Sequence, residues 1–187
     1  CAPFLTFQFQ VNEGEKHTIS SHLIGAYNID NMLAAITIGL EFGVSIDAIC
    51  HALENYIPSN NRSQFEQTAD NKLIVDAYNA NPSSMMAALQ NFNIMKADNK
   101  MAILGDMREL GEVSEEEHQK IVDFIASTNL NNVWLVGAEF TKTNCNFRKF
   151  DDIEQVKAAI AENKPKNHCI LIKGSNGIKL FQLPELL

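Results

Sequence analysis

The feature that most constrains this chain is a series of short apolar runs that alternate with segments of helical periodicity. The runs are KLIVDAY (72–78), KMAILG (100–105), NVWLVG (132–137) and HCILIKG (168–174). Their near-continuous Ile, Leu and Val content is typical of strands that are buried on both faces. Buried strands that alternate with helices indicate a parallel sheet with right-handed crossovers. We therefore expect an α/β fold with a doubly wound, mostly parallel sheet.

Helical spacing recurs between these strands, together with signals for helix starts. The predicted helices span 83–96, 114–127 and 152–163. Pro82 stands just before the first of them, where proline is tolerated because the first helical turn has no partner for an N–H in any case. Ser114 and Glu117 have the spacing of a capping box, so we expect Ser114 to be the N-cap of the second helix.

The first part of the chain has a different pattern. Residues 4–11 (FLTFQFQV) alternate between apolar and polar and predict a half-buried strand, and residues 17–23 are its expected antiparallel partner. Residues 28–42 have helical spacing, which Gly43 ends. Ser45 is a good N-cap for a second helix that follows at once.

A domain boundary is expected near residue 58. The segment IPSNNRS (57–63) gathers Pro, Ser and Asn without apolar periodicity, which is typical of a linker. Residues 1–57 would be the end of a larger domain, because two strands and two helices make a poor core by themselves. Residues 58–187 would form the doubly wound domain. The sequence starts at Cys1 without Met and without signal-peptide regions, which suggests a fragment of a longer protein.

Composition excludes several classes of protein. The chain has 187 residues, 45% of them hydrophobic, and a formal net charge of −8. The apolar content is too high for a disordered chain, and no run of apolar residues is long enough to predict a membrane span. The acidic balance argues against a nucleic-acid partner, since phosphate binding needs clustered Lys and Arg. The cysteines lack C-x-x-C spacing and fit reduced thiols of a cytosolic protein: Cys1, Cys50, Cys145 and Cys169.

The loops that follow the predicted strands are the candidate binding loops, because ligands of open α/β sheets bind beyond the carboxyl ends of the strands. Polar groups exceed what a turn needs in YNANPSSM, DMRELGEVS and SNGIKL. Ordinary turn or capping roles remain the alternative for these residues, and His118 is expected to be a packing or surface residue of its helix. Neither G-x-x-x-x-G-K-[ST] nor G-x-G-x-x-G occurs, so both common phosphate-binding loops are missing.

Several of these segments, in this order, resemble the Mur ligase family. They are LIGAYNIDNMLAA (23–35), NNRSQF (60–65), DAYNANPSSMMAAL (76–89), LGDMRELGEVSEEEH (104–118) and LIKGSNGIKL (171–180). D-x-Y-N-A-N-P and L-G-D-M-x-E-L-G are most similar to the members that join D-alanyl-D-alanine to UDP-N-acetylmuramoyl-tripeptide. The resemblance implies that residues 1–57 end a central ATP-binding domain. Residues 58–187 would then be the Rossmann-like C-terminal Mur ligase domain.

The resemblance also implies an ATP site. Its residues are Asn28, Asn31, Arg62, Asp76 and Tyr78. Asn28 and Asn31 would read adenine, because an amide offers both a donor and an acceptor to the base edge. Asp76 would accept hydrogen bonds from ribose hydroxyls, Arg62 would contact ATP from the linker, and Tyr78 would lie near the phosphates. Tyr27 replaces a His that the family usually has before the first of these asparagines.

A second implied site would bind D-alanyl-D-alanine. Its residues are Asn79, Asn81, Asp106, Met107, Lys173 and Ser175. Lys173 and the N–H groups after Gly174 would hold the carboxylate, whereas Asp106 and the two asparagines would accept from the amine. Met107 is flexible and apolar enough to pack on the alanine methyl groups. Asn176 stands where the family often has Arg.

The activity implied is cytoplasmic synthesis of a peptidoglycan precursor. ATP would phosphorylate the terminal carboxylate of the tripeptide, and the amine of D-alanyl-D-alanine would then displace phosphate. ATP and Mg²⁺ are the expected cofactors, with the metal ligands and the phosphate-binding loop outside this chain, so the chain alone is expected to be inactive. The alternatives are a related ligase for a different amino acid, and a stand-alone, non-catalytic module that binds nucleotide or another partner.

Overall fold

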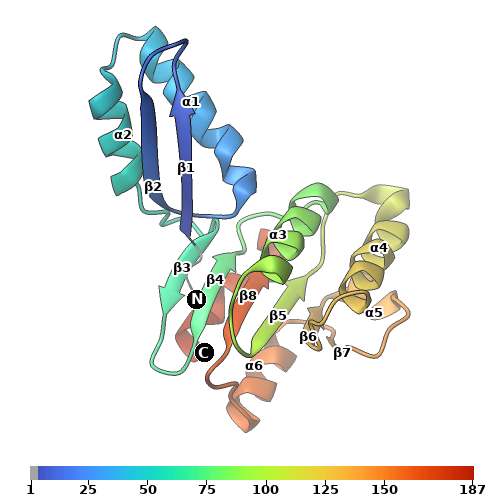
Figure 1. Cartoon of the computed structure of the whole chain (residues 1–187). Coiled ribbons are helices and arrows are strands. Elements are labelled where there is room, and N and C mark those ends of the chain that lie inside the picture. The colour runs from blue at the N-terminus through green and yellow to red at the C-terminus, as the bar shows by residue number, and fades with distance from the viewer. Residues whose placement is uncertain (1–3) are drawn as a thin grey trace. The chain divides into compact units, whose positions relative to one another are not determined.

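The computed structural model describes residues 4–187, which divide into two compact units, one up to residue 59 and the other from residue 60 to residue 187. Figure 1 shows the elements of each unit. No helix within the described residues is long and apolar enough to cross a membrane.

The unit up to residue 59 pairs an antiparallel hairpin with two helices. Its elements are β1 (Phe4–Gln10), β2 (Lys16–Ile24), the 3₁₀ turn η1 (Ala26–Asn28), α1 (Ile29–Glu41) and α2 (Ile46–Asn55). Alternate strand positions and one face of each helix bury a small apolar core, formed by Phe9, Ile19, Met32, Ile36 and Ile49. The Ser45 hydroxyl accepts a hydrogen bond from the Ala48 N–H, so its predicted role as N-cap is confirmed.

The unit from residue 60 onward is built on one six-stranded sheet with the order β3-β4-β8-β5-β6-β7. Its strands are β3 (Gln64–Gln67), β4 (Lys72–Asp76), β5 (Lys100–Gly105), β6 (Asn132–Val136), β7 (Arg148–Phe150) and β8 (Cys169–Lys173). Its helices are α3 (Pro82–Ile94), α4 (Ser114–Ala126), α5 (Ala138–Lys142) and α6 (Ile153–Glu162). Only β3 runs antiparallel to its neighbour, so the predicted mostly parallel α/β sheet is confirmed.

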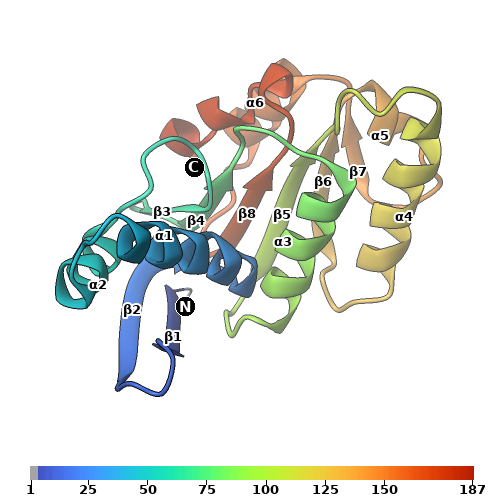
Figure 2. The same cartoon turned by 90° about the horizontal axis from the view of Figure 1, so that it is seen from above.

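Helices cover both faces of this sheet, as Figure 2 shows with α3 and α4 on one side and α6 on the other. Alternate residues of the central strands, such as Val75, Ile103 and Ile172, pack in one cluster with Val156 and Ile160 of α6. The intervening strand residues are buried as well, which explains why the sequence shows continuous apolar runs rather than alternation.

The predicted capping role of Ser114 is wrong. A 3₁₀ turn, η2 (Gly111–Val113), leads directly into α4, so Ser114 already has helical backbone angles (φ −56°, ψ −50°). A side-chain N-cap needs an extended backbone at the capping residue. The Ser114 hydroxyl therefore donates to Glu139 Oε2 at 2.9 Å instead of capping its own helix.

Candidate functional site

The loops after β4, β5 and β8 lie side by side, because β8 pairs with β4 on one side and with β5 on the other. Lys173, the last residue of β8, is in register with Asp76 on β4 and with Leu104 on β5. Asp76 ends β4 and Gly105 ends β5, so the candidate loops begin at one common edge of the sheet. This is the carboxyl edge at which open α/β sheets bind ligands.

Asp76 and Lys173 form an ion pair at this edge. The Lys173 Nζ donates to Asp76 Oδ2 at 2.6 Å, and Lys173 is only 2% exposed. The other carboxylate oxygen, Oδ1, accepts from the Ser63 N–H at 3.3 Å. The Lys173 ammonium is thus already neutralised inside the unit, because a buried charge is stable only with such a partner.

Arg62 and Tyr78 form an exposed stack. Arg62 directly precedes Ser63, and Tyr78 lies two residues after Asp76. The Arg62 guanidinium carbon lies 4.0 Å from the centre of the Tyr78 ring. Asn61 and Ser63 on either side of Arg62 both have left-handed backbone angles, with φ of 57° and 48°. The linker thus presents the guanidinium on the face of an aromatic ring, where a cation is attracted by the π electrons.

Asn79 and Asn81 both bond to nearby backbone. Asn79 Oδ1 accepts from the Ala80 N–H at 2.8 Å. Asn81 is the N-cap of α3 and forms a capping box with Ser84, whose N–H donates to Asn81 Oδ1 at 2.8 Å. Their side-chain oxygens therefore shape the turn before α3.

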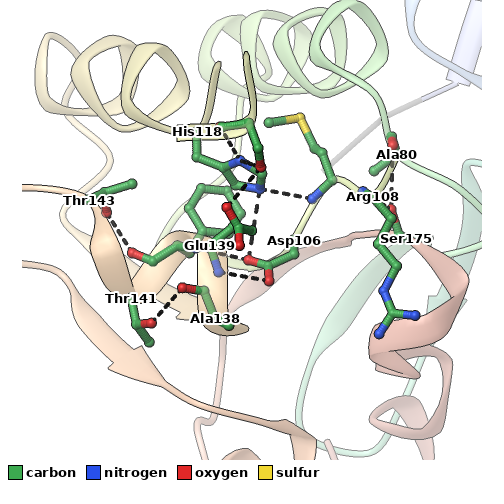
Figure 3. Close-up of polar contacts among 12 residues, drawn as sticks. Ala80, Asp106, Arg108, His118, Ala138, Glu139, Thr141, Thr143 and Ser175 are labelled. Carbon is green, nitrogen blue, oxygen red and sulfur yellow. Dashed lines mark hydrogen bonds and ion pairs between the residues drawn. The ribbon is translucent and has the colours of Figure 1, made fainter. Parts of the chain in front are cut away.

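Ser175 connects the candidate loops, as Figure 3 shows. Its hydroxyl accepts from the Arg108 N–H at 2.9 Å and donates to the Ala80 carbonyl oxygen at 3.4 Å. Its own N–H donates to the Asp106 carbonyl oxygen at 3.1 Å. Because Ser175 is 3% exposed, its role in this structure is to hold the loops together.

The Asp106 carboxylate points toward α5 (Figure 3). Its oxygens accept from the Glu139 N–H at 3.0 Å and from the Phe140 N–H at 2.9 Å. These are free donors at the start of the short helix, so Asp106 caps it from another loop. Gly137 makes the approach possible, since a Cβ on it would lie 2.3 Å from Asp106 Oδ2.

The buried His118 ring of α4 holds the loop after β5 by a hydrogen bond. The sequence did not predict the hydrogen bonds of this ring. The ring is fully buried, and its Nε2 accepts from the Met107 N–H at 3.0 Å. Nε2 is therefore unprotonated, so Nδ1 carries the proton and donates to the Ser114 carbonyl oxygen at 2.7 Å. The Met107 side chain is 1% exposed and is buried inside the unit.

An open hollow lies next to this loop. Its lining residues come from the β5–α4 loop and from the helices beside it: Asp106, Met107, Arg108, Glu109, Leu110, Gly111, Ser114, Glu139 and Lys142. Lys142 bonds to Glu139 and, with the Ser114 hydroxyl, lowers the pKa of the Glu139 carboxyl below its ordinary value. Glu139 in turn raises the pKa of Lys142. Among residues 4–187, no three His, Cys, Asp or Glu side chains are grouped to hold a metal ion.

The remaining predicted residues lie in the other unit. Asn28, at 9% exposure, donates from Nδ2 to the Ile24 carbonyl oxygen at 2.8 Å. Its Oδ1 accepts from Asn31 Nδ2 at 3.0 Å, so the two amides share one helix face. Asn31 is exposed, and Asn28 orients it.

Comparison with known proteins gives consistent results. A family model described as Mur ligase, glutamate ligase domain, matches residues 61–176. A protein of Rickettsia prowazekii named UDP-N-acetylmuramoyl-tripeptide–D-alanyl-D-alanine ligase is 33% identical over 86% of this chain and 36% of its own length. The Bacillus subtilis protein of that name is 29% identical over 91% of this chain and 40% of its own length. The chain thus spans well under half of each relative.

Solved structures agree with the fold. MurF from Acinetobacter baumannii has a TM-score of 0.82 and 27% identity, covering 98% of this chain and 42% of that one. MurF from Thermotoga maritima, solved in complex with ADP, has a TM-score of 0.81 over 98% of this chain and 43% of its own, and at 20% identity it supports the fold alone. Because the family model covers more than half of the sequence, this chain belongs to the Mur ligase family and carries its C-terminal domain.

Proposed function

We propose that this chain is the C-terminal part of an ATP-dependent ligase that joins D-alanyl-D-alanine to UDP-N-acetylmuramoyl-tripeptide. The observation that carries the proposal is the match over about nine tenths of the chain to relatives with that name. Residues 1–57 would be the end of the central ATP-binding domain, and residues 58–187 the C-terminal domain. The phosphate-binding loop and the Mg²⁺ ligands would lie in the part of the enzyme that precedes this chain.

The residues that would contact ATP are those at the ATP-binding positions that the family resemblance implies: Asn28, Asn31, Arg62, Asp76 and Tyr78. Asn31 is exposed, and Asn28 fixes the orientation of its amide. In the other unit, Arg62 and Tyr78 offer an exposed cation and an aromatic face. Asp76 would accept from the ribose hydroxyls, with its carboxylate held in place by Lys173. Magnesium bound to the full enzyme would offset the negative charge of the phosphates.

The dipeptide would bind at the loops after β4, β5 and β8. Ser175 joins these loops, so it would position the residues that touch the ligand. Asn79 and Asn81 are exposed, and each side-chain oxygen, which already accepts one backbone N–H, would use its second lone pair to accept from the amine of the dipeptide. Asp106, Met107 and Lys173 are buried and would act mainly by fixing the shape of the pocket.

In the proposed reaction the tripeptide carboxylate attacks the γ-phosphorus of ATP, and ADP leaves. The amine of D-alanyl-D-alanine then attacks the acyl carbon of the acyl-phosphate, phosphate leaves with the C–O electron pair, and the amine loses its proton. The task of this chain would be to hold the amine beside the acyl carbon. Enclosing the acyl-phosphate would also protect it from hydrolysis by water.

The test is ligation by the full-length protein from which the chain derives. The enzyme would receive ATP, Mg²⁺, UDP-N-acetylmuramoyl-tripeptide and either D-alanyl-D-alanine or single amino acids, and mass spectrometry would identify the product. We expect the pentapeptide product only with the dipeptide, and phosphate release that depends on both acceptor and donor.

Two results would contradict the proposal. Addition of a single amino acid in preference to the dipeptide would indicate a related ligase, and no addition at all would indicate a non-catalytic role. The 187-residue chain alone serves as the matched control and should release no phosphate from ATP, because it has no loop that can hold the β- and γ-phosphates.

A further inference from the structure

We propose that Arg108 binds the C-terminal carboxylate of the incoming dipeptide and so selects a donor that ends in a free acid. The inference rests on the function proposed above. Arg108 follows Met107 in the β5–α4 loop, and its side chain is exposed at the rim of the hollow described above.

The main chain of Arg108 is fixed. Its N–H donates to the Ser175 hydroxyl at 2.9 Å, and Ser175 also holds the Asp106 carbonyl oxygen through its own N–H. The preceding N–H, that of Met107, donates to the buried His118 ring. Two consecutive amides are thus anchored to buried side chains, which sets the direction in which the Arg108 side chain leaves the loop.

The guanidinium lies over the turn that follows β8, in the region shown in Figure 3. Its Nη2 donates to the Gly177 carbonyl oxygen at a long 3.4 Å. A Cβ on residue 177 would lie 2.4 Å from Nη1 and 2.5 Å from Cζ, so glycine at this position makes room for the planar group. The turn therefore supports the guanidinium without consuming most of its donors.

Three other cations near this edge are already engaged. Lys173 is buried against Asp76, Lys142 is bonded to Glu139, and Arg62 stacks on Tyr78. Among the interactions of residues 4–187, by contrast, the Arg108 guanidinium has the Gly177 carbonyl as its hydrogen-bond partner and no carboxylate. Its remaining N–H groups can take both oxygens of a ligand carboxylate at once, which an ammonium group cannot do with the same geometry.

The joined loops carry groups for both ends of the ligand that the proposed reaction needs. The dipeptide has an amine at one end and a carboxylate at the other, and Asn79 and Asn81 lie in the loop to which Ser175 joins Arg108 through the Ala80 carbonyl. A carboxylate on Arg108 would leave the amine free to approach the acyl carbon. Burial of Lys173 leaves Arg108 as the better candidate for the carboxylate, because Lys173 is only 2% exposed.

The test uses full-length enzyme and two donors, D-alanyl-D-alanine and its C-terminal amide, which lacks the negative charge. Wild type, Arg108→Ala, Arg108→Lys and Lys179→Ala would be compared at saturating ATP and tripeptide, and the KM for ATP would be measured separately at saturating dipeptide. Lys179 is the matched control, because it is an exposed cation two residues beyond Gly177 and does not line the hollow. We expect Arg108→Ala to raise the KM for D-alanyl-D-alanine roughly ten- to a hundredfold, as for loss of a charged hydrogen bond.

The amide donor isolates the carboxylate contact. Wild type and Lys179→Ala should prefer the acid over the amide by about the same factor, whereas Arg108→Ala should treat the two alike, with the KM for ATP unchanged. Arg108→Lys should restore part of the preference, since it keeps the charge. Arg108→Gln keeps the polar stem and carries the test if Arg108→Ala fails to fold.

The results that would overturn the role of Arg108 differ from those that would overturn the proposed function. An Arg108→Ala enzyme that still prefers the acid as strongly as wild type, or a Lys179→Ala enzyme that loses the preference, would overturn the assignment. Equal rises in the KM values for ATP and dipeptide would show a loop defect and would also overturn it. If wild type ligates neither donor, the proposed function fails, independently of Arg108.

Discussion

Lys173 Nζ and Asp76 Oδ2 lie 2.6 Å apart, joining the last residue of β8 to the last residue of β4. The contact follows from the sheet, because the two residues are in register on adjacent parallel strands and their side chains point to the same face. Because Lys173 is only 2% exposed, its ammonium depends on this carboxylate for neutralisation inside the folded unit.

Removing either partner of this pair should be strongly destabilising, whereas removing both should cost less. Asp76→Ala leaves the Lys173 ammonium buried without a partner, so we expect a loss of about 3–5 kcal/mol in the free energy of unfolding. The double variant Asp76→Leu/Lys173→Met buries no charge and should lose less than Asp76→Ala alone. Urea unfolding followed by fluorescence of the single tryptophan, Trp134 of β6, reports on this unit. A loss in the double variant equal to the sum of the losses in Asp76→Leu and Lys173→Met would show that the two residues do not act as a pair.

Gly137 should tolerate no side chain. Its φ is +120°, and an added Cβ would lie 2.3 Å from the Asp106 carboxylate that caps α5. Gly137→Ala should therefore lose about 3 kcal/mol or more, from backbone strain and displacement of Asp106 together. Gly111→Ala is the matched control, because Gly111 also has positive φ (+57°) but no atom within 4 Å of the added Cβ. It should lose only about 1–2 kcal/mol in the same urea assay. Equal losses would mean that backbone conformation alone decides the cost.

His118 should matter for the position of the loop that bears Arg108. His118→Ala removes the acceptor for the Met107 N–H and the donor to the Ser114 carbonyl, and opens a void beside Phe140, whose ring centre lies 4.6 Å away. We expect a loss of about 3 kcal/mol in the free energy of unfolding. His118→Asn, which can present an amide to one of the two groups, should recover part of it. Unchanged stability in His118→Ala would show that water replaces both hydrogen bonds.

The central strands of the sheet could be predicted because Ile, Leu and Val fill both faces without interruption, as in Lys100–Gly105, whose predicted bounds are those of the structure. The edge strands could not. Gln64–Gln67 is a polar strand at the edge, and Arg148–Phe150 has only three residues, so neither carries an apolar run. Both are stabilised by pairing with a neighbour that the sequence does not reveal.

The candidate site shows the same division. The sequence indicated which loops hold polar residues, because strand ends can be located from the apolar runs. It did not indicate partners, since these depend on strand order: Lys173 meets Asp76 only because β8 lies next to β4. Asp106 likewise bonds to α5, a helix of five residues that is too short to show periodicity. The sequence also did not predict that Lys173 and Ser175 are buried. Because they are buried, we expect the ligand to contact exposed neighbours such as Arg108 instead.

Stability should respond to acid through Glu139. Its carboxylate accepts from Lys142 Nζ at 2.7 Å and from the Ser114 hydroxyl at 2.9 Å, and these bonds lower its pKa below the ordinary value of 4.5. A carboxyl whose pKa is lowered in the folded state stabilises that state above its unfolded pKa, and the contribution disappears as the pH falls through the folded pKa.

Glu139→Gln should therefore be less stable than wild type at pH 7, by a few tenths of a kcal/mol because the pair is largely solvent-screened. The difference should vanish in acid below the folded pKa, where the wild-type carboxyl is protonated and resembles Gln. Urea midpoints of the two proteins, measured by Trp134 fluorescence at stepwise lower pH, check this, and a difference that stays constant into acid would contradict it.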